Sequence, residues 1–156
     1  MPGKFNQRLW NIGRKIEDEC LPLLNKFFDA DFKRDDNIFD VLDFHDKDKK
    51  IICEIKGRTT ASDKYPDTII PYNKVQEGLM MIEEGYKVYF VFVFTDKNFY
   101  IELKEDTEFN VKLTGTNYIQ HALIPIKDLE EVSESAPVPV PPAPSDPSPS
   151  VQSVWV

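Results

Sequence analysis

The sequence predicts a mixed α/β fold in which helices pack on a mixed β-sheet, in the order helix, three strands, helix, two strands. Three observations lead to this prediction. Apolar residues recur at helical spacing in residues 5–28 and in residues 72–84. Short runs rich in aromatic and β-branched residues lie between and after these segments. One run, residues 88–95, is apolar almost throughout, which is typical of a central strand buried on both faces.

The first predicted helix covers residues 5–28. Its apolar positions are Leu9, Ile12, Ile16, Cys20, Leu23, Leu24 and Phe27. Pro22 has no backbone N–H to donate, so we expect a kink or a break near it. Glu17 lies at the margin of the apolar stripe, where it is either an exposed acid or a residue that reaches a site at the sheet's edge. An edge strand over residues 30–33 and a turn over residues 34–37 are expected to follow.

An antiparallel pair of strands is predicted over residues 39–44 and 51–55, because both segments are rich in aromatic and β-branched residues and the residues between them are polar. A turn centred on Lys47 places Asp40 directly opposite Glu54. Side chains in that relation share one face of the sheet and stand roughly 5 Å apart.

Alternation along the second strand of this pair separates its charges from its apolar residues. Glu54 and Lys56 share one face, and the other face consists of Ile51, Cys53 and Ile55. The carboxylates of Asp40 and Glu54 therefore converge with a lysine. Mg²⁺ is held in proteins by one or two carboxylates with waters and substrate phosphates, so the pattern favours a metal site for phosphodiester hydrolysis. An exposed cross-strand ion network is the alternative.

The second predicted helix, residues 72–84, follows a proline-containing loop over residues 59–71 that we expect to act as a flap or a substrate-binding loop. Gly85 stands where a helix commonly ends with a left-handed residue. Gln76 and Lys74 lie at opposite borders of the apolar face of this helix. Only one of them can look toward the strand pair, and we expect it to be Gln76; the alternative is that both are surface residues.

The remaining segments predict a few more strands and then a tail. Strands are expected over residues 99–103, 111–113 and 118–126, with a turn of helix over residues 127–131. Residues 133–150 hold more than half of the 12 prolines, a composition that cannot form a packed core. We therefore divide the chain into a domain, residues 1–132, and a disordered tail, residues 133–156. The tail ends in an apolar segment with Trp155, which is either a docking peptide for a protein partner or a frayed end.

Composition sets limits on the class of protein. A chain of 156 residues with 41% apolar residues suits one domain with a sizeable core. It has no signal peptide and no apolar run long enough to span a bilayer, so we expect an intracellular protein that is neither secreted nor placed in a membrane. The 2 cysteines and 2 histidines show no zinc-ligand spacing.

The net charge of −8 argues against nucleic-acid binding, which needs a basic surface. The basic residues are not evenly spread, however. A group near the start of the chain consists of Lys4, Arg8, Arg14 and Lys15, and two more, Arg58 and Lys64, follow the strand pair. These residues are either a local phosphate-binding surface or a merely solvated one.

Two short segments carry a family resemblance. Phe39-Asp40-Val41-Leu42 and Cys53-Glu54-Ile55-Lys56-Gly57-Arg58 resemble the motifs of the PD-(D/E)XK nuclease superfamily, which has the restriction-endonuclease-like fold and includes Holliday-junction resolvases and viral and repair nucleases. Phe39 stands where the family's name has proline. The resemblance covers about residues 7–103 and implies a core of the order αβββαββ.

The resemblance implies a nuclease that uses Mg²⁺ or Mn²⁺, with DNA as its expected substrate. The metal ligands that it implies are Asp40, Glu54 and the backbone carbonyl of Ile55. Lys56 would orient the attacking water or offset charge in the transition state. The residues expected to support the site are Glu17 and Gln76. The basic side chains expected to contact the substrate are Arg58, Lys64 and Lys74.

Two functions of different classes therefore remain open. One is a metal-dependent endonuclease, for which a homodimer is a further expectation because nucleases of this fold that cut both strands often work as dimers. The other is a catalytically silent, nuclease-like binding or scaffold module that acts through its proline-rich tail.

Overall fold

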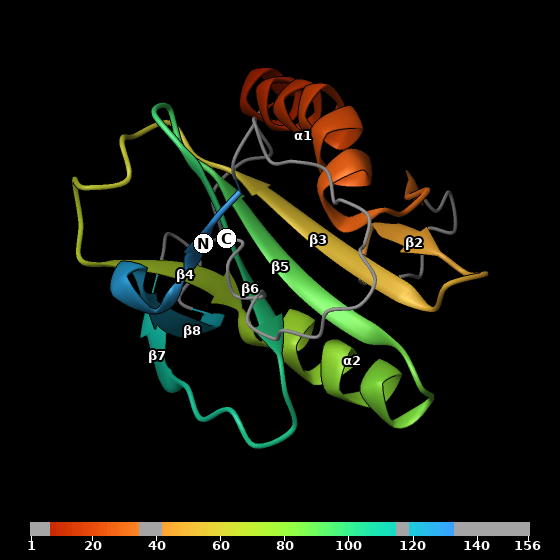
Figure 1. The fold of residues 1–156 in the computed structure, drawn as a ribbon. Coiled ribbons are helices and arrows are strands. Elements are labelled where there is room, and N and C mark those ends of the chain that lie inside the picture. Colours follow the sequence, from red (N-terminus) through yellow and green to blue (C-terminus); the bar gives the residue numbers. More distant parts are fainter. Residues whose placement is uncertain (1–6, 35–41, 115–118, 133–156) are drawn as a thin grey trace, which may run out of the picture.

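The structure, a computed structural model, describes residues 7–34, 42–114 and 119–132 (Figure 1). In these residues the elements are α1 (Gln7–Phe28), β1 (Lys33–Arg34), β2 (Phe44–Asp46), β3 (Ile51–Gly57), β4 (Asp67–Pro71), α2 (Tyr72–Glu83), β5 (Lys87–Val93), β6 (Asn98–Leu103), β7 (Asn110–Thr114), β8 (Ile119–Pro125), the short 3₁₀ helix η1 (Ile126–Asp128) and β9 (Glu130–Glu131). Neither α-helix is long and apolar enough to cross a membrane.

The main sheet has six strands in the order β1-β2-β3-β5-β6-β9. Its two central strands, β3 and β5, run parallel, and every other neighbouring pair is antiparallel. Parallel neighbours need a long crossover connection, which here consists of β4 and α2. The mixed α/β class and the order of helices and strands predicted from periodicity are confirmed, with β4 as an added strand.

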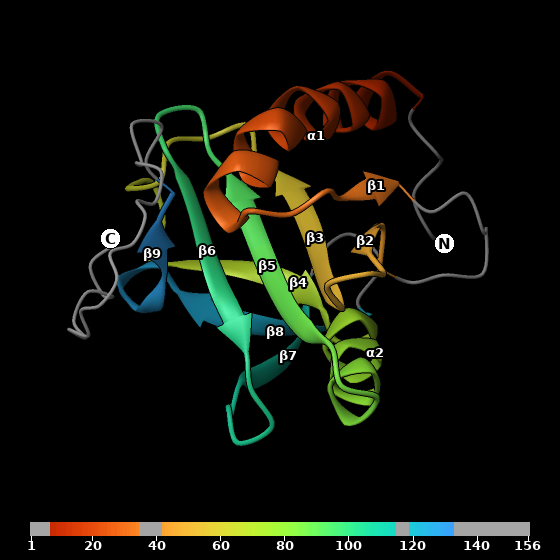
Figure 2. The same ribbon diagram turned by 45° about the vertical axis from the view of Figure 1, so that its right-hand side comes forward.

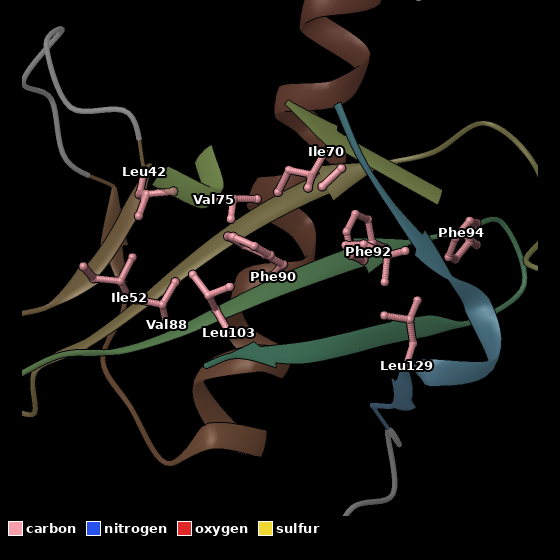
Figure 3. Close-up of a cluster of buried hydrophobic side chains, with 12 residues drawn as sticks. Leu42, Ile52, Ile70, Val75, Val88, Phe90, Phe92, Phe94, Leu103 and Leu129 are labelled. Atoms are coloured by element: carbon pink, nitrogen blue, oxygen red, sulfur yellow. The ribbon is translucent and has the colours of Figure 1, made fainter. Parts of the chain in front are cut away.

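The sheet separates the molecule into layers. Helix α1 covers one face of the main sheet, while α2 and a second sheet of order β4-β8-β7 cover the other (Figures 1 and 2). Each face has its own apolar core. The core under α1 includes Cys20, Leu24, Phe44, Cys53, Ile55 and Val91. The core on the α2 side includes Ile52, Val75, Val88, Phe90, Phe92 and Leu103 (Figure 3).

Alternation along β3 decides which side chains meet which helix. Cys53 and Ile55 are fully buried under α1, as predicted for the apolar face of this strand. Ile52 lies on the opposite face, in the core beside α2. Glu54 and Lys56 share this second face with Ile52, since they are two and four residues further along the strand.

The predicted pairing of the two strands before Arg58 is wrong in register. β2 and β3 pair through Phe44↔Cys53 and Asp46↔Ile51, so the turn covers residues 47–50 and is not centred on Lys47. The carboxylate of Asp46 explains the position of this turn. It accepts the backbone N–H of Lys49 at 3.1 Å inside the turn and that of Asp31 at 2.9 Å across the edge of the sheet.

Three further expectations need correction. Residues 67–71, predicted as loop, form β4, because they pair with β8, a segment far along the chain. Helix α1 continues through Pro22, so the expected break is wrong and the alternative, a kink, stays a prediction; the buried residues Cys20 and Leu24 hold the helix against the sheet on either side of this proline. Residues 127–131, predicted as helical, divide between η1 and β9, which extends the main sheet.

Two glycines of this fold do different things. Gly85 has φ +97°, and it ends α2 as predicted, in a conformation that side chains rarely adopt. Gly57, at the end of β3, lets α1 approach closely. A Cβ added there would lie 3.0 Å from Cγ2 and 3.1 Å from Cδ1 of Ile16. Residue 16 of α1 therefore packs directly over the strand end next to Lys56.

Gly57→Ala is expected to lower the free energy of unfolding by about 1–3 kcal/mol, the usual range for overpacking, because Ile16 is β-branched and cannot rotate away in a helix. The loss should shrink when Ile16→Ala is combined with it, as measured in a double-mutant cycle by chemical denaturation.

Gly13→Ala is the matched control, since an added Cβ there meets nothing within 4 Å and alanine favours the helix. If Gly57→Ala lowers the free energy of unfolding equally in the wild type and in Ile16→Ala, the proposed contact between residues 57 and 16 is wrong.

Candidate active site

Glu54 is the centre of the candidate site, and it is a fully buried acid in the middle of β3. Its Oε1 accepts the backbone N–H of Asp43 at 3.2 Å. Its Oε2 forms ion pairs with Nζ of Lys74 at 3.1 Å and with Nζ of Lys56 at 3.7 Å. Oε2 nevertheless has no hydrogen-bond partner within the described residues.

The pKa of Glu54 is raised above its ordinary value. Burial is the main cause, because a carboxylate loses its hydration inside the protein, and the negative charge of Asp43 acts in the same direction. The charges of Lys74 and Lys56 act to lower the pKa and offset burial only in part. The carboxylate therefore has fewer favourable contacts than it would have in water, and a further cation beside Oε2 would stabilise its ionised form.

Lys56 stands on the same face of β3 as Glu54, as the alternation of the strand predicts. Its side chain is 28% exposed, whereas Glu54 is inaccessible, so the amine stands between the buried carboxylate and solvent. This places a cation where a reacting group could reach it.

The structure places Asp43 beside Glu54 in the position that the sequence had predicted for Asp40. Continuing the observed pairing of Phe44 with Cys53 by one residue brings Asp43 opposite Glu54. The hydrogen bond from the Asp43 backbone to Glu54 agrees with that register. Asp40 lies outside the described residues. The spacing of aspartates in the sequence could not choose between the two, because the choice depends on where the turn is.

The expected preference for Gln76 over Lys74 is also wrong. Nζ of Lys74 contacts Glu54 and its side chain is 15% exposed, whereas Gln76 is an exposed residue of α2. The two residues border the apolar face of α2 on opposite sides, and the crossing of the helix over β3 decides which border meets Glu54. Lys74 is thus part of the charged cluster, although the sequence analysis expected it only as a contact for the substrate.

Glu17 is held at the edge of the site by an arginine that the sequence analysis missed. Nη2 of Arg34 donates to Oε1 of Glu17 at 3.2 Å and to Oδ1 of Asp18 at 2.9 Å. The guanidinium lies over the ring of Phe44, with its Cζ 4.6 Å from the centroid. Arg34 had been predicted in a turn, and only the pairing of β1 with β2 brings it here.

The electrostatics of Glu17 connect it to the same cluster. Burial raises its pKa above the ordinary value, the hydrogen bond and charge of Arg34 act against that rise, and the charges of Asp43 and Lys56 also act on it. Glu17 thus lies within electrostatic range of Asp43 and Lys56, and its role in the site stays a prediction.

Arg58 has a structural position at the end of β3. Its Nε donates to Oγ1 of Thr68 at 3.1 Å, its Nη2 donates to the carbonyl of Ile69, and its Cζ lies 5.5 Å from the centroid of the Phe92 ring. These contacts connect β3 to β4, and burial lowers the pKa of the guanidinium. Lys64 is exposed, with its Nζ 5.7 Å from the ring centroid of Tyr65. Contact of either residue with a substrate stays a prediction.

A complete set of metal ligands is not brought together by the described residues, which contain no group of three or more His, Cys, Asp or Glu side chains placed to hold an ion. Glu54 still fits a cation, because its carboxylate is buried and its pKa is raised although two lysines stand beside it. The backbone carbonyl of Ile55 as a third ligand stays a prediction.

The layered fold and the Glu-x-Lys cluster on its central strand agree with the resemblance to the PD-(D/E)XK superfamily. The chain belongs to the family described as "Phage putative PDDEXK endonuclease", whose model matches residues 17–119, more than half of the sequence. This match extends from Glu17 through Asp43, Glu54, Lys56 and Lys74. No curated protein and no solved structure matches the chain.

The raised pKa of Glu54 predicts how the free energy of unfolding depends on pH when no metal is bound. Between the ordinary pKa, 4.5, and the raised one, the folded state binds more protons than the unfolded state. The contribution of Glu54 to stability is therefore fully present below about pH 4.5 and is lost as pH rises through the raised pKa. Measured in EDTA, the free energy of unfolding of the wild type minus that of Glu54→Gln should fall as pH rises over this window.

Glu83→Gln, in an exposed glutamate of α2, controls for the loss of one negative charge. A difference between wild type and Glu54→Gln that grows with pH would mean that Lys56 and Lys74 more than offset burial, which would contradict the raised pKa.

Proposed function

We propose that this chain is a metal-dependent endonuclease that hydrolyses phosphodiester bonds in DNA. The observation that carries the proposal is the carboxylate of Glu54, which is buried and stands between Lys56 and Lys74 in a chain of the PDDEXK family. A buried acid with a raised pKa is costly to the fold, so its presence favours a role in binding a cation.

A divalent ion, Mg²⁺ or Mn²⁺, would polarise the scissile phosphate and offset its charge when bound. Glu54 would supply one ligand, and the second carboxylate would come from Asp43 or Asp40. The backbone carbonyl of Ile55 is proposed as a further ligand. Oxygen ligands of this kind suit both ions, so the choice between them is left to the assay.

Lys56 is proposed to act on the reacting groups. Its amine is partly exposed beside the buried carboxylate, so it can donate a hydrogen bond to an attacking water or to a phosphate oxygen. A fixed cation at that place stabilises the negative charge that develops in the transition state. Lys74 is proposed to offset substrate charge from α2, since it lies against the same carboxylate oxygen. Glu17 is assigned a supporting role through its contact with Arg34.

Cleavage of labelled DNA by the purified chain is the direct test. We expect cleavage with Mg²⁺ or Mn²⁺ and none with EDTA. Glu54→Gln should abolish it, because the variant removes the charge of a ligand. Lys56→Ala should bind Mn²⁺ as the wild type does, as measured by calorimetry, but cleave about 100- to 1000-fold more slowly, as when one electrostatic group is removed from other active sites.

Cleavage that survives in Glu54→Gln would point to a contaminating nuclease. If the wild-type chain cuts neither single-stranded nor duplex DNA in Mn²⁺, the proposal is contradicted. That result would favour a nuclease-like scaffold that acts through residues 133–156.

A second comparison identifies the aspartate that assists Glu54. The register of β2 and β3 places Asp43 beside Glu54, so we expect Asp43→Asn to abolish Mn²⁺ binding and cleavage. Asp40→Asn is the matched variant, with the same change of charge three residues earlier. If Asp40→Asn abolishes both activities and Asp43→Asn leaves them unchanged, the assignment of Asp43 is wrong and the family motif at Asp40 supplies the ligand.

A further inference from the structure

The first turns of α1 concentrate positive charge in an otherwise acidic chain. Residues 7–16 include Arg8, Arg14 and Lys15 and contain no acidic residue, although the net charge of the protein is −8. We call residues 7–15 of α1 the basic arm. Polyanions are the ligands that such a charge distribution attracts.

The basic arm does not belong to either apolar core. The buried residues of α1 are Cys20 and Leu24, both in the second half of the helix. Residues 7–12 are all exposed, and they include the large apolar side chains of Leu9, 58% exposed, and Trp10, 46% exposed. Figure 2 shows the second half of α1 over the strands and its red first turns rising away from them.

Arg14 and Trp10 form a pair on the surface of this arm. The Cζ atom of Arg14 lies 5.1 Å from the centroid of the Trp10 ring, at the i, i+4 spacing that brings side chains together on a helix. The pair presents a guanidinium and an exposed aromatic edge side by side. Arginine with an aromatic ring is the combination that proteins use to hold phosphates and bases of nucleic acids.

The basic arm is continuous with the candidate active site. Arg14 precedes Glu17 by three residues on the same helix, so the two side chains lie about one helical turn apart. Ile16 packs on Gly57, the residue after Lys56. The end of the arm therefore lies beside the end of β3 that carries Lys56, although the Lys56 side chain stands on the face of the sheet opposite α1, and Glu17 is within electrostatic range of it.

The acidic residues that follow the arm do not cancel its charge. Glu17 and Asp18 are paired with Arg34. Glu19 lies 3.9 Å from Lys15 in an exposed pair, an interaction that contributes little because water screens it. Arg8 is exposed and Arg14 is partly exposed, on the turns of α1 that precede Glu17.

We propose that the basic arm binds the backbone of the nucleic acid substrate, with Arg8, Arg14 and Lys15 contacting phosphates and Trp10 lying against a base or sugar. This inference rests on the proposed nuclease function, since it names the surface that delivers the substrate to Glu54 and Lys56. It is independent of which aspartate assists the metal.

Binding without cleavage tests the arm. The affinity of the full chain for a fluorescein-labelled DNA duplex and for one of its strands is measured by anisotropy in EDTA over a salt series. Each phosphate contact contributes roughly 0.9 to the slope of log affinity against log salt for duplex DNA. For the variant R8E/R14E/K15E we expect a slope shallower by about 2 to 3 and an affinity at least about tenfold lower.

The matched control is K87E/K112E/K127E, which makes the same change in net charge at exposed lysines of other elements and should bind DNA nearly as the wild type does. The reversal at Arg8 lies in the first turn of α1, where an acidic side chain is favourable, but acids at positions 14 and 15 would stand three and four residues before Glu17, Asp18 and Glu19, so a variant without new negative charge is also needed. R8Q/R14Q/K15Q, whose circular dichroism is compared with that of the wild type, is a second variant that should also lose affinity.

Trp10 gives an independent signal. The chain has 2 tryptophans, so Trp155→Phe leaves Trp10 as the only one. We expect DNA to quench its fluorescence in proportion to binding, as stacked or adjacent bases do. The absence of any quenching at saturating DNA would overturn the assignment of Trp10.

The outcomes separate this inference from the proposed function. Loss of affinity in the arm variants of a chain that never cleaves DNA would support the arm and contradict the nuclease proposal. Metal-dependent cleavage with equal affinities and slopes in the arm and control variants would support the nuclease and overturn the arm. Loss of binding to vesicles of anionic phospholipid, with DNA affinity unchanged, would assign the arm to a membrane surface and overturn the inference.

Discussion

Glu54 places a carboxylate between apolar residues at the centre of the main sheet, where an ionised acid loses its hydration. The effective penalty for such burial is on the order of several kcal/mol per ion, and it is offset only by well-placed partners. Here the partners come from three parts of the chain: Lys74 from α2, Lys56 from β3 itself, and the backbone N–H of Asp43 from the residues before β2. The positions of these elements around β3 are therefore linked through one side chain.

This constraint works against stability as well as for it. Lys74 and Lys56 both contact Oε2, but the raised pKa means that the lysines do not fully replace water. Apolar side chains of similar volume often stabilise a fold more than a buried ion pair does. A buried acid whose charge is only partly offset is typical of sites where binding or chemistry, and not stability, decides the residue. Two apolar cores hold β3 from both faces and so fix the position of Glu54.

Local patterns predicted the elements of the fold but not their pairing. Periodicity is sufficient for α1, α2, β3 and β5, because each exposes or buries its own residues in a regular order. The register of β2 against β3 depends on Asp46, whose carboxylate binds the N–H of Asp31, a contact between residues 15 positions apart. β4 was missed for a similar reason, since its partner β8 lies about 50 residues further along the chain.

The sequence by itself determined the class of the fold, the charged face of β3 with Glu54 and Lys56, and the family to which their spacing points. These depend on alternation and helical period, which are properties of neighbouring residues. Only the tertiary structure decided that Asp43 lies beside Glu54, that Lys74 and not Gln76 meets it, and that Arg34 holds Glu17. Those contacts join residues from different elements, so they are set by strand register and by helix crossing, which no single stretch of sequence encodes.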